Sequence, residues 1–169
     1  MANTYQLISS ATVGSGGTAT MSFTSIPSTY TDLVLFVSAR TNRAGDIVDE
    51  LYLTFNSNTS NYSWRRLLGE ASASGDSGSN RTVILANASN STANVLGNAT
   101  VYIPNYAGSG NKPYSVDSVM EQNATNAARQ LLAGLWSNSA AITQIDLTSF
   151  TGSNFVQYST AYLYGISNA

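Results

Sequence analysis

The sequence predicts an all-β protein, an antiparallel β-sandwich of jelly-roll type with about eight to ten short strands and long polar loops. Short apolar or alternating segments recur along the chain, and clusters of Gly, Ser, Asn or Pro separate them. Ser, Thr and Asn make up roughly a third of the residues, a composition that suits pleated strands and turns. The pattern contains no regular alternation of strands with long helices, which parallel βαβ units would require.

The segment at 31–40, TDLVLFVSAR, is the longest unbroken β-type run and the expected centre of the sandwich. Alternate residues of an extended chain face opposite sides. One side carries aliphatic residues at 33, 35 and 37, and the other carries Val34 and Phe36, so both faces of this strand are apolar. We therefore expect the strand to lie inside the sandwich and to leave the core near Arg40.

The remaining strands are predicted from period-two alternation and from the turns between them. The segment 61–70, NYSWRRLLGE, is too short for periodicity to distinguish a short strand from one helical turn, and we interpret it as irregular to β. Residues 127–136 are expected as a strand, with a helix over 123–132 as the alternative. The segments 142–150 and 155–166 are expected to form a hairpin around a TGSN turn. The other expected strands are 5–13, 18–26, 47–55, 81–86, 94–103 and 114–122.

A single domain over residues 1–169 is expected, because this length suits one core. Two polar segments rich in Gly, 71–80 and 105–113, are predicted to be long surface loops at the ends of the sandwich. Residues 1–13 are expected to form either the first strand or an N-terminal arm.

The composition excludes several classes of partner. Only 9% of the residues are charged, the formal net charge is −2, and the seven basic residues are scattered from Arg40 to Arg129. Because they form no positive stripe, nucleic acid is not an expected partner. The sequence shows neither a bilayer-spanning apolar run nor a secretion signal, so we expect synthesis in a cytosol and no membrane partner.

Residue types that most catalytic sites need are absent from the chain. It contains neither His nor Cys, so it cannot build a Ser-His-Asp triad, a cysteine nucleophile or the usual zinc sites. Its one lysine, Lys112, lies among Gly, Asn and Pro, where a solvated side chain is expected. We predict no enzymatic activity and no cofactor.

Asp46, Asp49 and Glu50 form the one cluster of carboxylates. Paired catalytic carboxyls must face each other across a cleft, and sequence neighbours seldom do so. The cluster is interpreted as a solvated turn next to Arg43. A calcium site is the alternative interpretation, and loop carbonyls would have to supply its further oxygen ligands.

Aromatic residues are candidates for a binding surface. Tyr62 and Trp64 precede a pair of arginines, and Tyr106 and Tyr114 flank the second polar loop. We expect these four side chains at a protein interface, with stacking on sugars or simple burial as the alternatives. Trp136 ends an apolar strand and is expected in the core.

Five segments share a recognisable sequence style. They are MANTYQLISSATVGSGG, TDLVLFVSARTNR, VYIPNYAGSGNKPYSVDSV, AGLWSNSAAITQIDL and NFVQYSTAYLYGI. Together they cover nearly the whole chain, and they resemble a family of small virion structural proteins of tailed bacteriophages, especially aquatic phages and cyanophages. The resemblance implies a jelly-roll-like sandwich that assembles on the virion.

Within that family, the resemblance implies a capsid decoration (cement) protein as the leading function. Such proteins typically form homotrimers, so the implied partners are further copies of the chain and the major capsid protein. The chain would bind without catalysis and add contacts that stabilise the shell, and many copies would make a weak contact sufficient. Tyr5 and Leu7 are the expected anchors of the N-terminal segment.

Two other functions agree with the same residues. A tail or fibre component would bind a host-surface glycan through the long loops. A carbohydrate-binding module could use the same fold, because a fold alone does not determine function. The virion is the expected location, with the capsid surface preferred to the tail.

Overall fold

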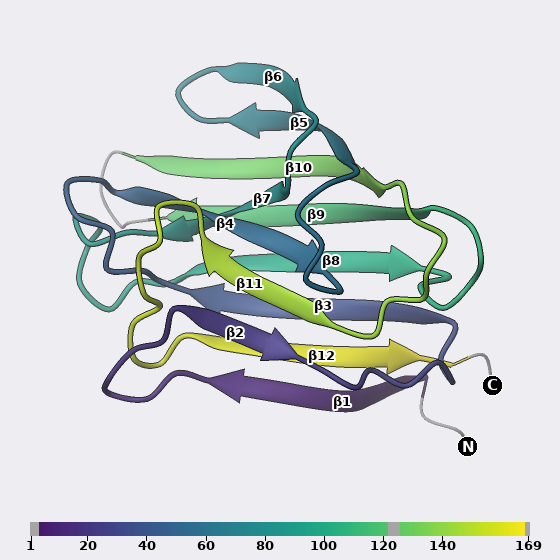
Figure 1. The fold of residues 1–169 in the computed structure, drawn as a ribbon. Coiled ribbons are helices and arrows are strands. Elements are labelled where there is room, and N and C mark those ends of the chain that lie inside the picture. The colour runs from purple at the N-terminus through teal and green to yellow at the C-terminus, as the bar shows by residue number, and fades with distance from the viewer. Residues whose placement is uncertain (1–3, 122–125, 168–169) are drawn as a thin grey trace.

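The computed structural model describes residues 4–121 and 126–167, which form twelve strands in two antiparallel sheets (Figure 1). The large sheet has eight strands in the order β1 (Tyr5–Thr12), β12 (Thr160–Ile166), β3 (Asp32–Ala39), β8 (Gly97–Pro104), β9 (Lys112–Glu121), β10 (Ala127–Trp136), β5 (Tyr62–Gly69) and β6 (Ala73–Gly78). The small sheet has four strands in the order β2 (Thr20–Phe23), β11 (Ile145–Ser149), β4 (Val48–Phe55) and β7 (Thr82–Asn87). The predicted all-β sandwich is confirmed, with more strands than expected. Over the described ranges, no helix is long and apolar enough to cross a membrane.

The strands follow a nested pairing. The first strand pairs with the last, β1 with β12, and the same rule pairs β2 with β11, β3 with β8 and β4 with β7. These eight strands alone would make two four-stranded layers. Two inserted pairs, β5 with β6 and β9 with β10, join each other through β5 and β10. Because β9 also pairs with β8, the insertions extend one layer to eight strands.

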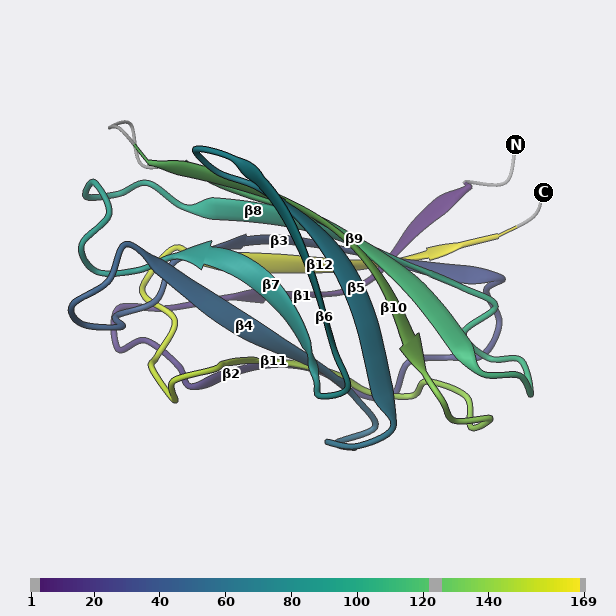
Figure 2. The same ribbon diagram turned by 90° about the horizontal axis from the view of Figure 1, so that it is seen from above.

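The large sheet twists strongly from one end to the other. Seen from above, β5 and β6 cross the direction of β1 and β12 steeply (Figure 2), as expected when right-handed twist accumulates over many strands. The twisted end covers β7, whose residues are all buried. Gln130 of β10 donates a hydrogen bond to the Val83 carbonyl of β7, and the Leu85 amide donates one to Ser118 of β9.

The core lies between the two sheets, and part of it is an aromatic cluster. Phe55 contacts Tyr62, Tyr114 and Trp136, with ring centroids 5.4 to 6.0 Å apart. Trp136 is buried, as predicted. Gly134 makes room for this cluster, because a Cβ at that position would lie 2.2 Å from the Tyr114 ring. Close packing of this kind is what makes core substitutions costly.

Residues 71–80 are not a loop, contrary to the prediction. They contain β6, an edge strand that pairs with β5 along its whole length. Small residues in β6 offer little apolar surface, so the ladder and an ion pair hold it instead: Arg66 of β5 donates to both carboxylate oxygens of Asp76 at 2.7 and 3.0 Å. The second predicted loop is found, as the connection from β8 to β9.

The predicted hairpin of 142–150 and 155–166 is wrong. Its first strand, β11, lies in the small sheet between β2 and β4, and its second, β12, lies in the large sheet between β1 and β3. Each strand thereby has two neighbours, whereas an isolated hairpin would give it one.

Three other expectations concern single segments. Residues 62–69 form a strand, and 127–136 form a strand rather than a helix; residues 123–125 of the helical alternative lie outside the described residues. Residues 5–12 are the first strand of a sheet rather than an arm. Residues 1–3 and residue 122, at the end of the expected strand 114–122, also lie outside the described residues.

Strand β3 is an interior strand of the large sheet, but only one of its faces lies in the core. Leu33, Leu35 and Val37 point inward. Val34 and Phe36 point to the opposite side, where Val34 is buried at 4% exposure outside the core cluster and Phe36 is 41% exposed. The expectation that the sandwich covers both faces is therefore wrong for this chain alone. Apolar residues on both faces are nevertheless typical of strands that are covered on both sides.

Candidate functional site: the outer face of the large sheet

Exposed large hydrophobic side chains gather on one face of the molecule. The described residues include nine of them, and seven point outward from the large sheet. These seven are Tyr5, Leu7, Phe36, Leu67, Tyr102, Leu131 and Tyr162. The other two, Phe150 and Tyr158, lie outside the strands. A face that gathers apolar side chains in water indicates contact with another molecule.

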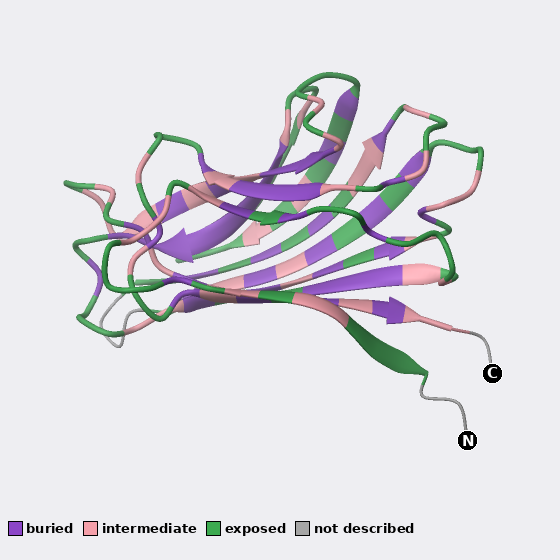
Figure 3. Cartoon of the chain, turned by 60° about the horizontal axis from the view of Figure 1, so that its bottom comes forward, coloured by how far each residue is buried: buried purple, intermediate pink, exposed green. Residues whose placement is uncertain are grey.

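One half of this outer face is an aromatic patch, which we define as Tyr5, Leu7, Phe36, Tyr102, Tyr162 and Tyr164. Strand register makes these residues neighbours, because Leu7 lies opposite Tyr164 and Tyr162 opposite Phe36. The Tyr164 ring meets those of Tyr5 and Phe36 edge to face, with centroids 6.5 and 5.9 Å apart. Figure 3 shows that the outer end of β1 is exposed. The rings hold one another in a defined arrangement on the surface.

The aromatic patch is almost free of charge. Asp32 is the one charged residue in β1, β12, β3 and β8. Its carboxylate accepts hydrogen bonds from the Tyr102 hydroxyl at 2.9 Å and from the Asn105 amide at 2.8 Å. The hydrogen bond to Asp32 raises the pKa of Tyr102. The patch therefore presents hydroxyls, rings and one carboxylate.

The other half of the outer face is hollowed into a groove of about 780 Å³. We call it the leucine groove; its outward-facing lining residues are Arg65, Leu67, Gly75, Ser77, Ser115, Asp117, Leu131 and Ala133. Leu67 lies opposite Leu131 in the register and is 66% exposed. Gly75 on the far side of Leu67 has no side chain to fill the space. The groove therefore has an apolar floor with room above it.

Two charged groups border the leucine groove. Asp117 forms an ion pair with Arg129 at 2.9 Å. The guanidinium of Arg65 has no ion-pair or hydrogen-bond partner among the residues that the structure describes. The groove thus carries one positive charge that the chain itself does not neutralise.

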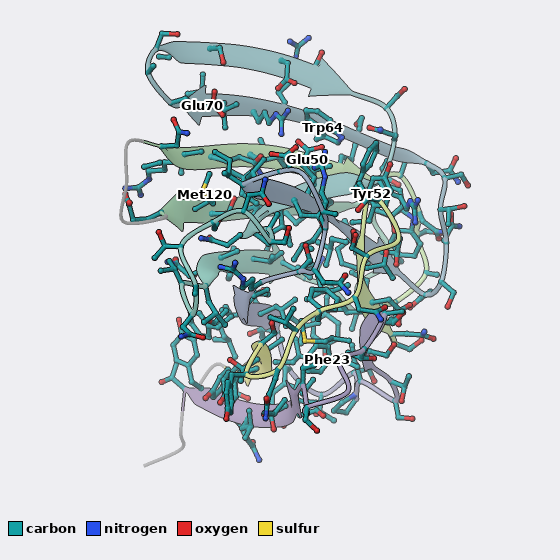
Figure 4. All side chains as sticks on the ribbon, turned by 90° about the vertical axis from the view of Figure 1, so that its left-hand side faces the viewer. Phe23, Glu50, Tyr52, Trp64, Glu70 and Met120 are labelled. Carbon is teal, nitrogen blue, oxygen red and sulfur yellow. The ribbon has the colours of Figure 1, made fainter. Side chains whose placement is uncertain are left out.

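Arg66, the next residue along β5, points to the inner side of the large sheet, opposite the groove. Its contacts hold in place β5 and β6, the two strands on one side of the groove. Its guanidinium binds Glu50 of β4 at 2.8 Å and Asp76 of β6 at 2.7 Å, and it lies over the Trp64 ring. Figure 4 shows Glu50 and Trp64 in the same part of the molecule. This network ties the β5–β6 hairpin to the small sheet.

Of the six predicted interface residues, Tyr5 and Leu7 lie in the aromatic patch. The expectation that Tyr62, Trp64, Tyr106 and Tyr114 lie at the surface is wrong, because all four are buried. The first two occupy inward positions of β5, and Tyr114 occupies an inward position of β9.

The hydroxyls of the buried tyrosines find partners in the core. Tyr106 donates to the Pro27 carbonyl, and Tyr114 shares a hydrogen bond with Thr82. Burial raises the pKa of Tyr62 to about 12 and also raises the pKa of Tyr114. These four aromatics serve the core instead of a binding surface.

The residues that sequence reasoning missed on this face are Phe36, Leu67, Leu131, Tyr162 and Tyr164. A signal for them was present. Val34 and Phe36 make a second apolar face on β3, and the tyrosines of β12 alternate with Leu163. Adjacent strands with an apolar second face indicate a covered outer surface.

The carboxylates of 46–50 face three different environments. Asp46 pairs with Arg43 at 2.9 Å, as the interpretation of a turn beside Arg43 predicted. Asp49 is buried rather than solvated, and it accepts hydrogen bonds from the hydroxyls of Thr41 and Ser149, both at 2.7 Å.

Glu50 points to the opposite side of β4 from Asp49, because successive strand residues alternate, and it binds Arg66. Asp49 also lies 3.8 Å from the guanidinium of Arg43, so Asp46 and Asp49 share this arginine, whereas Glu50 does not join them. In the described ranges no three His, Cys, Asp or Glu residues form a group able to hold a metal ion.

Lys112 is also buried, contrary to the expectation of a solvated side chain. Its ammonium donates to the carbonyls of Gly108, Gly110 and Ser139, and burial lowers its pKa. These carbonyls belong to two separate connections, so only the folded chain brings them together. The lysine fastens the β8–β9 connection to the segment after β10.

Comparison of the chain with models of protein families, with curated proteins and with solved structures finds no significant match.

Proposed function

We propose that the chain is a non-catalytic structural protein of a tailed-bacteriophage virion, a capsid decoration protein that docks through the outer face of its large sheet. The observation that carries the proposal is the concentration of exposed hydrophobic side chains on that face, seven of nine among the described residues. Aromatic residues with hydroxyl groups and little charge are the composition of protein interface cores.

The pairing of the strands supports the proposal. Nested pairing of first with last strand, repeated four times, is the connectivity of a ribbon rolled into two sheets. We infer that the eight strands outside the insertions form a jelly roll, a fold common in viral capsid proteins. This agrees with the fold that the sequence resemblance implies, although a fold alone does not determine function.

The proposed mechanism is binding without turnover. The outer face contacts the major capsid protein and further copies of the chain, and the buried contact area adds to the stability of the shell. Each contact can be weak, because a shell presents many equivalent sites. The resemblance implies a homotrimer as the bound form, made in the host cytoplasm and located on the virion.

Glycan binding by a tail or fibre component is the second candidate, and one observation favours it. Tyr158 is 70% exposed and lines a hollow of about 610 Å³ together with Asn94 and Gln157. A ring beside two amides can stack on a sugar and bond its hydroxyls. Glycan-array binding that Tyr158→Ala abolishes would establish this function.

The deciding experiment is cryo-electron microscopy of intact phage particles, with this protein located in the density. Density on the capsid shell at symmetry axes is the expected result. Density on the tail would overturn decoration in favour of the second candidate. Absence of the chain from purified virions would overturn both.

A further inference from the structure

The aromatic patch and the leucine groove are complementary surfaces on the same chain. The patch offers bulky rings, and the groove offers a hollow with two leucines on its floor. Each surface alone leaves apolar area in water, and each would bury the other's area on contact. From this pairing, which rests on the proposed docking role of the outer face, we propose that the aromatic patch of one copy packs into the leucine groove of a second copy.

The charges of the two surfaces also support a second copy of the chain as the occupant of the leucine groove. The patch strands carry one carboxylate, Asp32, and no basic residue. The groove carries Arg65, which has no partner in the described part of its own chain, whereas the nearby Asp117 is already paired with Arg129. A guanidinium near rings and a carboxylate gains both ion-pair and cation–π interactions. The unpaired charges of the two surfaces are thus opposite in sign.

The shapes of the two surfaces also support packing of the aromatic patch into the leucine groove. Three of the residues that flank the two leucines are small, Gly75 beside Leu67, Ala133 on β10 and Ser115 on β9, whereas Asp117 lies opposite Leu131. The patch residues are long and already arranged by edge-to-face contacts around Tyr164. Preorganised rings lose little freedom on entering a groove, which favours binding.

The two surfaces can meet in two ways. A reciprocal contact, in which each copy's patch fills the other copy's groove, makes an isologous dimer, whereas a one-way contact is heterologous. Heterologous contacts close into rings or continue as filaments. A ring of three copies is the homotrimer that the sequence resemblance implies. Patch-to-patch association would leave the groove empty.

Cross-linking can test which surfaces meet, because the chain has no cysteine of its own. Ser10 is exposed and lies opposite Tyr162 at the patch, and Ser77 is exposed and lines the groove. Two chains of different tag length, one carrying Ser10→Cys and the other Ser77→Cys, are mixed and treated with a short bis-maleimide. We expect a mixed product at a yield at least about tenfold above the product of either chain alone.

Ser22→Cys is the matched control, because Ser22 is an exposed serine on the outer side of the small sheet. It should give no mixed product with either partner. Arg65→Glu in the Ser77→Cys chain should lower the yield about tenfold by repulsion from Asp32, and Arg65→Lys should retain most of it.

Cross-linking of Ser10→Cys chains to one another, or no product in any mixture at high protein concentration, would overturn the inference. These outcomes are separable from failure of the proposed function. Density on the capsid without patch-to-groove product overturns only the inference, whereas the product without density on any virion overturns only the proposed function.

Discussion

The two sheets of the sandwich present very different outer faces. Outward positions of β2 and β11 in the small sheet carry Thr20, Ser22 and Thr148. The outward Tyr52 of β4 lies under the guanidinium of Arg81 at 3.6 Å and contacts the Phe150 ring at a centroid distance of 5.2 Å, and the outward residues of β7 are buried. Outward positions of the large sheet carry the aromatic patch and the leucine groove.

Both sheets follow the same period-two alternation, so local structure does not explain this difference. An antiparallel sheet with a solvated outer side shows polar residues there, as β2 and β11 of the small sheet do. The large sheet departs from this rule, and this departure is what supports the proposal that its outer face docks on a partner.

The largest expected effect is a loss of stability, and it compares one phenylalanine in the core with one on the outer face of the large sheet. Phe55→Ala removes a buried ring that touches three other aromatics and should lower the free energy of unfolding by about 3–5 kcal/mol. Phe36→Ala on the outer face should cost less than about 1 kcal/mol in the isolated chain. Urea unfolding at a dilution where the chain is monomeric measures both. Equal losses would contradict the assignment of Phe36 to an uncovered face.

The next effect compares the two outer faces in docking. Phe36→Glu should weaken binding to capsids stripped of this protein by about 2–4 kcal/mol, because it places a charge at the centre of the patch. Thr148→Glu on the small sheet is the matched control and should leave binding unchanged. Co-sedimentation with the stripped capsids measures both variants, after their melting temperatures show that they fold. If both variants lost binding to the capsids to the same extent, the two outer faces would not differ in docking.

The smallest expected effect is a loss of folding stability at alkaline pH, which identifies a tyrosine that belongs to the core. Burial raises the folded pKa of Tyr62 to about 12, above its ordinary value of 10.0, so the fold retains the protonated hydroxyl. The associated stability is fully present below pH 10 and is lost as the pH rises toward about 12, a loss of about 2–3 kcal/mol. Unfolding titrations from pH 9 to about 12 measure it.

Tyr62→Phe is the informative variant for this titration. It removes the titrating group together with the hydrogen bond that the Phe55 amide donates to it at 2.8 Å. The variant should therefore be less stable at neutral pH and show a shallower fall at alkaline pH. An unchanged slope would show that Tyr62 is not the group responsible.

The sequence by itself determined where most strands lie and which side chains of each point together. Period-two alternation is a local property, and it correctly assigned Leu33, Leu35 and Val37 to one face and Trp136 to the core. Absence of His and Cys is likewise a property of the sequence alone, and it limits the chemistry open to the chain however the strands are arranged.

Tertiary structure alone decided which strands are neighbours and which faces are covered. Strand β6 has little apolar surface, so only its ladder to β5 and the Arg66–Asp76 pair make it a strand. Lys112 is buried because carbonyls distant in sequence converge on its ammonium.

The same distinction applies to the candidate site. Alternation showed that β3 has two apolar faces, but both faces of a strand look alike in a sequence. Only the sheet order shows that one of them meets the core and that the other joins Tyr162 and Tyr164 of β12 on a surface left open to a partner.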